Sequence, residues 1–291
     1  MPSAFVHLHS HSSYSPMQGV PTLEALCQAI KEQGQDTLAL TDTNGLYGAI
    51  RFLDVARESG LKPILGAELI HGAHRAVLLA KTPTGYANLC RVLSKRHCDE
   101  SFDFIGTVAR YCEGLVILSD DLLALTAWKQ GAVEDLYVEL TPGPEMQEVA
   151  EVSRRLELPP VATARASFLT PADYQAHRLL RAIAENTTLS RLRADQCCSP
   201  SHWLMPMTAL ERYLPHVPEA LTNTRHVAEQ CHSNWDFQET IFPSFRQLSV
   251  GAAFETLRKK TYDGALWRYG WIPEIVTQRD RKSTRLNSSH G

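Results

Sequence analysis

Short apolar runs alternate with amphipathic stretches from residue 4 to residue 163 of the chain. Between residues 22 and 33, apolar side chains recur every three or four positions, which is typical of a helix that covers a sheet. Similar helical patterns are found at 48–59, 85–94 and 145–156. The apolar runs predict seven strands, at residues 4–9, 37–41, 63–68, 76–80, 115–118, 136–140 and 160–163.

This regular alternation of strands and helices predicts an α/β fold built on a parallel sheet, either open or closed into a barrel. Seven strands in this length of chain are compact for an eight-fold barrel. We therefore expect an irregular seven-stranded (β/α) barrel, with a doubly wound open sheet as the alternative. After residue 163 the chain becomes mainly helical, with helices predicted at 171–185, 218–231 and 251–267.

The composition is that of an ordinary globular protein, with 44% hydrophobic and 21% charged residues. No apolar run approaches the length of a membrane span, and no basic start precedes an apolar stretch, so we expect a cytoplasmic protein without a membrane partner. The seven cysteines form no C-x-x-C pair, which predicts reduced thiols. A net charge of −3 with scattered basic residues argues against a strong grip on DNA by this segment alone.

Three histidines occupy alternate positions at the end of the first predicted strand. His7, His9 and His11 should project to one face, because side chains alternate along a strand. In a parallel barrel the carboxyl ends of the strands form the functional rim. Two imidazoles spaced in this way can bind one divalent ion, whereas the alternative is that these are solvated or core histidines.

Two carboxylates end the next two predicted parallel strands. Asp42 follows the apolar run 37–41, and Glu68 ends the run 63–68. Either residue alone could cap the N-terminus of a helix or form a salt bridge with a basic side chain. With the histidines they suggest a centre of several metal ions that activates water and clamps a phosphate. The sequence has no G-x-S-x-G elbow, no phosphate-binding P-loop and no dinucleotide-binding glycine motif, so those enzyme classes are not favoured.

These motifs resemble the polymerase-and-histidinol-phosphatase (PHP) domain that opens bacterial DNA polymerase III alpha subunits and their error-prone relatives. The matching strings are Phe-Val-His-Leu-His-Ser-His-Ser-Ser-Tyr-Ser at 5–15, Ala-Leu-Thr-Asp at 39–42 and Gly-Leu-Lys-Pro-Ile-Leu-Gly-Ala-Glu at 60–68. Further matches, including 218–221 and 268–270, favour the polymerase subtype over stand-alone phosphatases. The resemblance covers nearly all residues from Phe5 to Gly270, and its motifs are specific only when taken jointly.

The resemblance implies three segments. Residues 1–240 would form the PHP domain with a helical extension, and residues 241–279 would begin the polymerase core and lead into its palm. Residues 280–291 look like the translation of a sequencing adaptor, so we expect a non-native tail and a gene cut short by the sequencing read.

Metal-binding members of this family use nine ligand positions, of which this sequence retains few. His9 and His11 match the first pair, and Glu68 matches the acid after the third strand. The departing positions carry Gln18, Thr43, Arg75, Asp120 or Asp121, Arg165 and Ser167.

Arg75 and Arg165 would place permanent positive charge where ions bind in the family. We therefore expect a vestigial Zn²⁺ or Mn²⁺ site that is empty, with His7, His74 and Asp121 as possible helpers. A further hypothesis is that Arg165 pairs with Glu68 or with an aspartate and so replaces an ion as a structural tie.

By resemblance, the parent protein is a DNA-directed DNA polymerase, a nucleotidyltransferase for replication or translesion synthesis, that uses DNA, dNTPs and Mg²⁺ held by palm aspartates. Those aspartates would follow residue 279, so this chain should contain no catalytic residue for polymerisation. Its implied role is to brace the polymerase core and dock a proofreading exonuclease subunit, and a sliding clamp is a further implied partner. The alternatives are a metal-dependent phosphoesterase or 3′–5′ exonuclease, and a phosphatase that resembles histidinol phosphatase. The choice between main replicase and error-prone polymerase stays open.

Overall fold

The computed structural model describes residues 5–237, 244–275 and 277–279. Residue 4 of the first predicted strand and the adaptor-like residues 280–291 lie outside this range. The chain divides into two compact units, Met1–Trp235 and Asp236–Gly291. None of the described helices combines the length and the apolar character needed to cross a bilayer.

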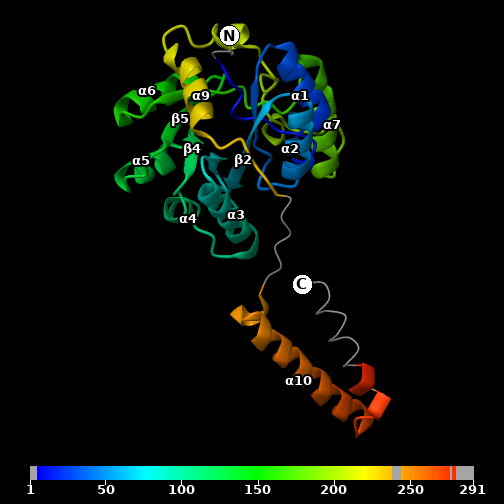
Figure 1. Cartoon of the computed structure of the whole chain (residues 1–291). Helices are drawn as coiled ribbons and strands as arrows, with labels where there is room; N and C mark the ends of the chain where they lie inside the picture. The colour runs from blue at the N-terminus through cyan, green and yellow to red at the C-terminus, as the bar shows by residue number, and fades with distance from the viewer. Residues whose placement is uncertain (1–4, 238–243, 276, 280–291) are drawn as a thin grey trace. The chain divides into compact units, whose positions relative to one another are not determined.

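A mixed sheet lies at the centre of the first unit (Figure 1). It has six strands in the order β1 to β6. β1 pairs in parallel with β2, and β4, β5 and β6 pair in parallel with one another. β3 runs antiparallel to both of its neighbours. The strands are β1 (Thr37–Leu40), β2 (Lys62–His71), β3 (His74–Ala80), β4 (Leu115–Ser119), β5 (Leu136–Leu140) and β6 (Pro160–Ala162).

The antiparallel placement of β3 corrects the expectation of a parallel sheet. Only Gly72 and Ala73 join β2 to β3, and two residues cannot carry the crossover helix that a parallel pair requires. Gly72 has a φ of 61°, a left-handed conformation that tight hairpin turns demand and glycine adopts without strain. β2 and β3 therefore form a hairpin inside an otherwise parallel arrangement.

The first predicted strand is present only as isolated parallel bridges, His7 with Leu38 and Ser10 with Ala166. His11 N donates to Ala166 O at 2.8 Å on the side of β6, and Ala39 N donates to His7 O at 3.0 Å on the side of β1. This N-terminal segment thus lies between the two edges of a curled sheet. The α/β class agrees with the sequence prediction, but a seventh regular strand is not confirmed within the described residues.

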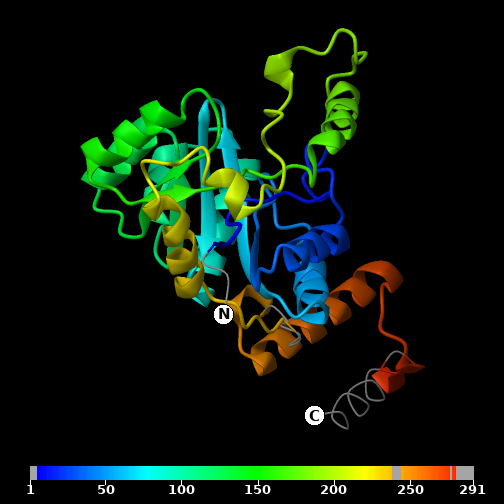
Figure 2. The same ribbon diagram turned by 90° about the horizontal axis from the view of Figure 1, so that it is seen from above.

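Helices pack on the sheet and surround it (Figure 2). α1 begins after Thr22, whose hydroxyl accepts from Ala25 N, and it buries Leu26 and Ile30, as the apolar periodicity predicts. The helices of the first unit are α1 (Leu23–Glu32), α2 (Ala49–Glu58), α3 (Pro83–Cys98), α4 (Phe104–Arg110), α5 (Leu122–Gln130), α6 (Met146–Leu156), α7 (Tyr174–Ala184), α8 (Met207–Leu210) and α9 (Glu219–Gln230). The short helices α4, α5 and α8 were not predicted from the sequence.

Alternate residues of the strands divide between two buried apolar clusters. On β4, Ile117 belongs to the larger cluster, which contains residues of α1 to α5, whereas Val116 and Leu118 belong to the smaller one. Leu8 and Ile64 also lie in the smaller cluster. Glu68 on β2 and Glu139 on β5 project to the same face of the sheet as this smaller cluster. The inner face of the curled sheet therefore carries buried acids next to apolar side chains.

The second unit contains α10 (Val250–Tyr269), preceded by a short 3-10 turn, Phe245–Gln247. Ser249 caps the start of α10 by accepting from Ala252 N. No residue of α10 is buried, and Val250, Leu257 and Trp267 are among its exposed apolar side chains.

Candidate metal centre and its arginine network

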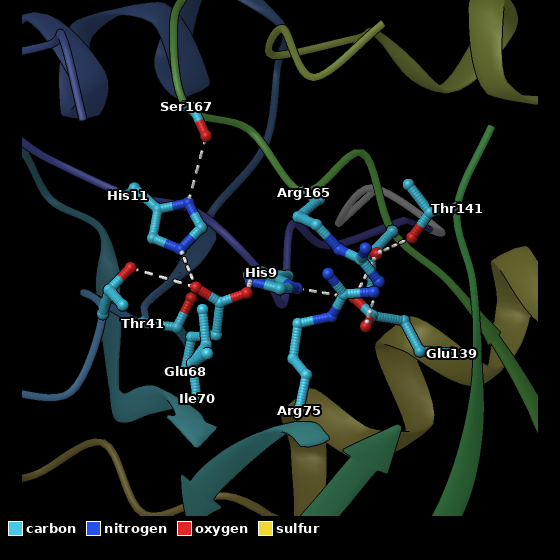
Figure 3. Close-up of polar contacts among 12 residues, drawn as sticks. His9, His11, Thr41, Glu68, Ile70, Arg75, Glu139, Thr141, Arg165 and Ser167 are labelled. Carbon is cyan, nitrogen blue, oxygen red and sulfur yellow. Dashed lines mark hydrogen bonds and ion pairs between the residues drawn. The ribbon is translucent and has the colours of Figure 1, made fainter. Parts of the chain in front are cut away.

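Two histidines of the N-terminal segment meet one carboxylate of β2. His11 Nε2 lies 3.1 Å from Glu68 Oε2, and His9 Nε2 lies 3.5 Å from Glu68 Oε1. All three side chains are buried, and their possible ligand atoms lie within 4.8 Å of one another. The structure therefore places together the three residues that the sequence marks as retained metal ligands (Figure 3).

His7 does not join this group, contrary to the expectation that His7, His9 and His11 share one face. Thr41 N donates to Ser10 O, while Ala39 N donates to His7 O, so a step of two residues from Ala39 matches a step of three residues from His7. This extra residue is a bulge, which breaks the alternation of side chains. His7 instead contacts Gln33 Oε1 through Nε2 at 3.3 Å and packs edge-on against Phe5.

Asp42 also lies outside the group, although the sequence suggested it as a metal ligand. Its carboxylate accepts from Ser12 N at 2.7 Å and from the Ser15 hydroxyl at 2.7 Å. Asp42 therefore holds the loop after the histidine motif. Two further polar contacts complete the surroundings of the group: the Thr43 hydroxyl donates to Glu68 Oε2 at 3.0 Å, and Ser167 Oγ lies 3.4 Å from His11 Nδ1.

The helper residues His74 and Asp121 pair with each other, because His74 Nδ1 lies 2.6 Å from Asp121 Oδ2. Asp121 also caps α5 by accepting from Leu123 N and Ala124 N. Neither side chain belongs to the His9, His11 and Glu68 group among the described residues.

Glu139 is the main site residue that the sequence reasoning missed. It lies on β5 with 1% of its surface exposed, and His9 Nδ1 lies 2.6 Å from its Oε1. The hydroxyl of Thr163 donates to the same oxygen. The signal was present in the sequence, since Glu139 is a lone acid inside the apolar run Leu-Tyr-Val-Glu-Leu.

Two arginines bind the carboxylates beside the histidines. Arg165 Nη2 lies 2.9 Å from Asp120 Oδ2 and 2.9 Å from Glu139 Oε2. Arg75 Nη2 reaches the same Asp120 oxygen at 2.7 Å. The hypothesis from the sequence was that Arg165 pairs with Glu68 or with an aspartate. Arg165 does pair with an aspartate, Asp120, and its second carboxylate partner is Glu139 rather than Glu68.

Figure 3 shows His9 between the two parts of this site, with His11 and Glu68 on one side and Arg75, Arg165 and Glu139 on the other. A cavity of about 300 Å³ lies against both parts. The residues that line it include His11, Glu68, Arg75, Arg165, Ser167 and His202.

The electrostatics keep Glu68 and Glu139 ionised. Burial alone would raise the pKa of the Glu68 carboxyl, but His11 and His9 hold this pKa well below its usual range. Burial acts on Glu139 in the same way, and there Arg165 and His9 lower the pKa further than burial raises it. Burial, together with Arg165 and its cationic neighbours, lowers the pKa of His202 to about 3. The charged arginines and carboxylates therefore balance one another inside the fold.

The donor set fits one metal ion. Two imidazole nitrogens and one carboxylate oxygen are ligands that zinc-type ions accept, and His9 Nε2 is buried without a hydrogen-bond partner. It does not fit a cluster of several ions, because guanidinium groups already bind Asp120 and Glu139. Within the described residues, no second group of three histidines, cysteines or acids has metal-ligand spacing.

Comparisons with known proteins agree on one family. The PHP domain profile matches residues 7–157 of this chain. An error-prone DNA polymerase from Symbiobacterium thermophilum is 29% identical over 95% of this chain and 30% of its own length. A DNA polymerase III subunit alpha from Halalkalibacterium halodurans is 27% identical over 92% of this chain and 27% of its own length.

A solved two-domain protein from Bacteroides vulgatus, described as containing a predicted PHP-like metal-dependent phosphoesterase, aligns with a TM-score of 0.45. It is 14% identical over 76% of this chain and 63% of that protein, a likeness too loose to support an argument. The chain spans less than a third of the length of the two polymerases. Because the PHP profile covers more than half of its residues, the chain belongs to the PHP domain family.

Proposed function

We propose that this chain is the PHP part of a bacterial DNA-directed DNA polymerase, of the replicative or the error-prone type, and that it acts as a scaffold. Its similarity to two polymerases over more than nine-tenths of its length supports this assignment. The parent enzyme would work in the cytoplasm on DNA and dNTPs with Mg²⁺. The PHP part would brace the polymerase core, dock a proofreading exonuclease subunit and leave clamp binding to the remainder of the parent.

The single observation that carries the scaffold role is the buried position of Arg165. This arginine, which follows β6, joins Asp120 after β4 to Glu139 on β5, and Arg75 on β3 shares the same aspartate. Four consecutive strands are therefore tied at one end by two cations and two anions. Ions that bridge carboxylates in a metal cluster would make ties of the same kind. In this chain, guanidinium groups make them permanently, because arginine stays charged.

The same network argues against hydrolysis by several metal ions. A second or third ion would need the oxygens of Asp120 and Glu139, which already accept from arginines at 2.7–2.9 Å. Two fixed positive charges would also repel it. One ion at His9, His11 and Glu68, when bound, would polarise a water or a phosphoryl oxygen. The grouping of these three donors is the observation that favours the second candidate, a phosphoesterase or 3′–5′ exonuclease.

We propose the segment boundaries by the same resemblance: a PHP domain with helical extension at 1–240, the start of the polymerase core at 241–279 and a non-native tail at 280–291. The exposed apolar residues of α10, Val250 and Trp267 among them, support the assignment of the second segment to a larger core, because such a surface is normally covered by a partner. We propose that the remainder of the parent polymerase covers it.

A thermal inactivation experiment on the parent polymerase tests this proposal. The wild type should extend a primed template, and Arg165→Ala should lower the temperature at which extension is lost. Arg154→Ala, which breaks only the exposed pair with Glu151, should behave as the wild type does. A parent that extends no primer would overturn the polymerase assignment, and an unchanged inactivation temperature in Arg165→Ala would overturn the scaffold role.

A further inference from the structure

His9 is held on one side only. Its Nδ1 lies 2.6 Å from Glu139 Oε1, and its ring is fully buried. Its Nε2 makes no hydrogen bond to any described residue and lies 3.5 Å from Glu68 Oε1. A buried polar atom without a partner is costly, so this nitrogen needs an explanation.

The contact with Glu139 decides which nitrogen carries the proton. Arg165 binds the other oxygen of Glu139 at 2.9 Å, which keeps the carboxylate ionised and able only to accept. Nδ1 of His9 is therefore a donor, which leaves Nε2 as the ring nitrogen that can bind a metal ion once it carries no proton. Nε2 faces the Glu68 carboxylate at 3.5 Å. A cation between these two atoms, either a proton on Nε2 or a metal ion in its place, would satisfy both.

The separations of the donor atoms suit such a cation. Ligand atoms bound to one ion at about 2.0–2.1 Å in a tetrahedral arrangement lie about 3.3–3.4 Å from each other. Glu68 Oε1 lies 3.5 Å from His9 Nε2, and Glu68 Oε2 lies 3.1 Å from His11 Nε2. One donor atom from each of the three residues lies within 4.8 Å of the others, so small side-chain shifts would bring the three donors to that spacing. A histidine that binds a metal ion through one ring nitrogen usually donates a hydrogen bond from its other ring nitrogen, often to a carboxylate such as Glu139.

We propose that Glu139 is a positioning residue for a one-ion site: it orients His9 so that Nε2 faces His11 and Glu68, and these three residues bind one zinc-type divalent ion. Glu139 therefore has two separate tasks, since one oxygen orients His9 and the other ties Arg165 into the fold. The inference concerns the site described above but does not rest on the polymerase assignment, because it follows from the contacts of His9 alone.

Cobalt titration of the full chain, stripped of metal, tests this role. Visible absorption of bound Co²⁺ reports both affinity and coordination geometry, which a merely structural contact would not alter. The wild type should bind one Co²⁺ per chain. Glu139→Gln should weaken Co²⁺ binding about 10- to 100-fold and change the spectrum, because the histidine loses its orienting carboxylate.

Asp120→Asn is the matched control. It also removes one carboxylate partner of Arg165, but the ion pairs of Asp120 are with Arg75 and Arg165 rather than with His9. Both variants should lose stability, whereas only Glu139→Gln should lose Co²⁺ affinity. Wild-type affinity and spectrum in Glu139→Gln would overturn the proposal, and so would an equal loss of affinity in Asp120→Asn or a wild type that binds no Co²⁺.

Nitrogen NMR of His9 in the wild type keeps the proposal testable if Glu139→Gln does not fold. On addition of Zn²⁺ the Nε2 resonance should shift, while Nδ1 remains protonated. A shift at Nδ1, or none at either nitrogen, would overturn the inference. The thermal result for Arg165→Ala is independent of these outcomes, so failure of the metal site and failure of the scaffold role can be told apart.

Discussion

Arg165 adopts a backbone conformation that residues with side chains seldom use, with a φ of 48°. The left-handed region costs a residue of this kind about 1–2 kcal/mol. Its side chain is only 9% exposed and binds two carboxylates. The contacts with Asp120 and Glu139 thus offset the backbone strain, which is consistent with a guanidinium that serves as a structural tie.

Arg165→Ala should lower the free energy of unfolding by about 3–5 kcal/mol, the usual effect of leaving a buried charge without its partner. The charge left behind is on Glu139, whose side chain has no solvent exposure and whose Oε2 would lose its arginine while Oε1 keeps His9 and Thr163. Urea unfolding followed by fluorescence would measure the loss. An equal stability of Arg165→Ala and the exposed control Arg154→Ala would contradict this account.

Two histidines, the buried His7 and the partly buried His202, should make the chain sensitive to mild acid. Burial lowers the pKa of His7 to about 4, and burial with neighbouring cations lowers that of His202 to about 3. The unfolded state takes up protons near pH 6.5 and the folded state does not, so stability should fall as the pH drops from 6.5 towards 4.5.

His202→Asn removes one of the two sources of this pH dependence. Its free energy of unfolding should fall less steeply between pH 6.5 and 4.5, by up to about 1.4 kcal/mol per pH unit. Urea unfolding at several pH values measures the slope. A variant as steep as the wild type would show that His202 is not kept neutral in the folded chain.

At this scale the sequence predicted the retained donors His9, His11 and Glu68 as a group, and the structure brings them together. The prediction that His7 shares a face with His9 and His11 was wrong, because a bulge depends on pairing with β1, which no local sequence pattern reveals. Sequence reasoning also missed Glu139, since an acid within an apolar strand is recognised as a site residue only when its partners His9 and Arg165 are known.

Among the elements, the amphipathic helices were predicted closely because their apolar stripes face the sheet. α1 and α2 begin and end within one residue of the expected limits. α5 was missed because Leu122 and Leu123, at its start, are exposed and obscure the stripe. β3 was predicted as a strand, but its antiparallel direction was missed because a two-residue turn, not the apolar pattern, decides that direction.

One close approach between elements is open to a direct test. The start of α3 lies against the turn before β4 so tightly that a Cβ on Gly85 would be 1.7 Å from the Gly114 carbonyl oxygen. Gly85→Ala should therefore lower the free energy of unfolding by about 1–3 kcal/mol, because α3 must move away from the sheet. Gly143→Ala, where the nearest atom is at 3.9 Å, should have little effect in the same unfolding assay. Equal stabilities for the two variants would contradict the tight packing of α3.

For the whole molecule, the α/β class and the PHP family could be predicted from the sequence. The alternation of strands and helices and the combination of several short motifs remain recognisable even when sequence identity to relatives is low. The resemblance extends over more than nine-tenths of the chain in polymerases that are three times as long. The curled sheet agrees with the expected barrel, but the loss of a regular seventh strand could not be predicted, since the N-terminal segment is held by isolated bridges between residues far apart, such as Ser10 and Ala166.

The central claim is that two arginines occupy the place of a multi-ion cluster, and metal counting combined with a hydrolysis assay tests it most directly. The chain is incubated with excess Zn²⁺ or Mn²⁺ and freed of unbound metal. Elemental analysis then counts the bound ions, and the same protein is assayed on a phosphodiester and on 3′-labelled DNA. The account predicts at most one ion per chain and no hydrolysis above background. Two or more ions per chain, with hydrolysis that disappears in His9→Ala and His11→Ala, would contradict it.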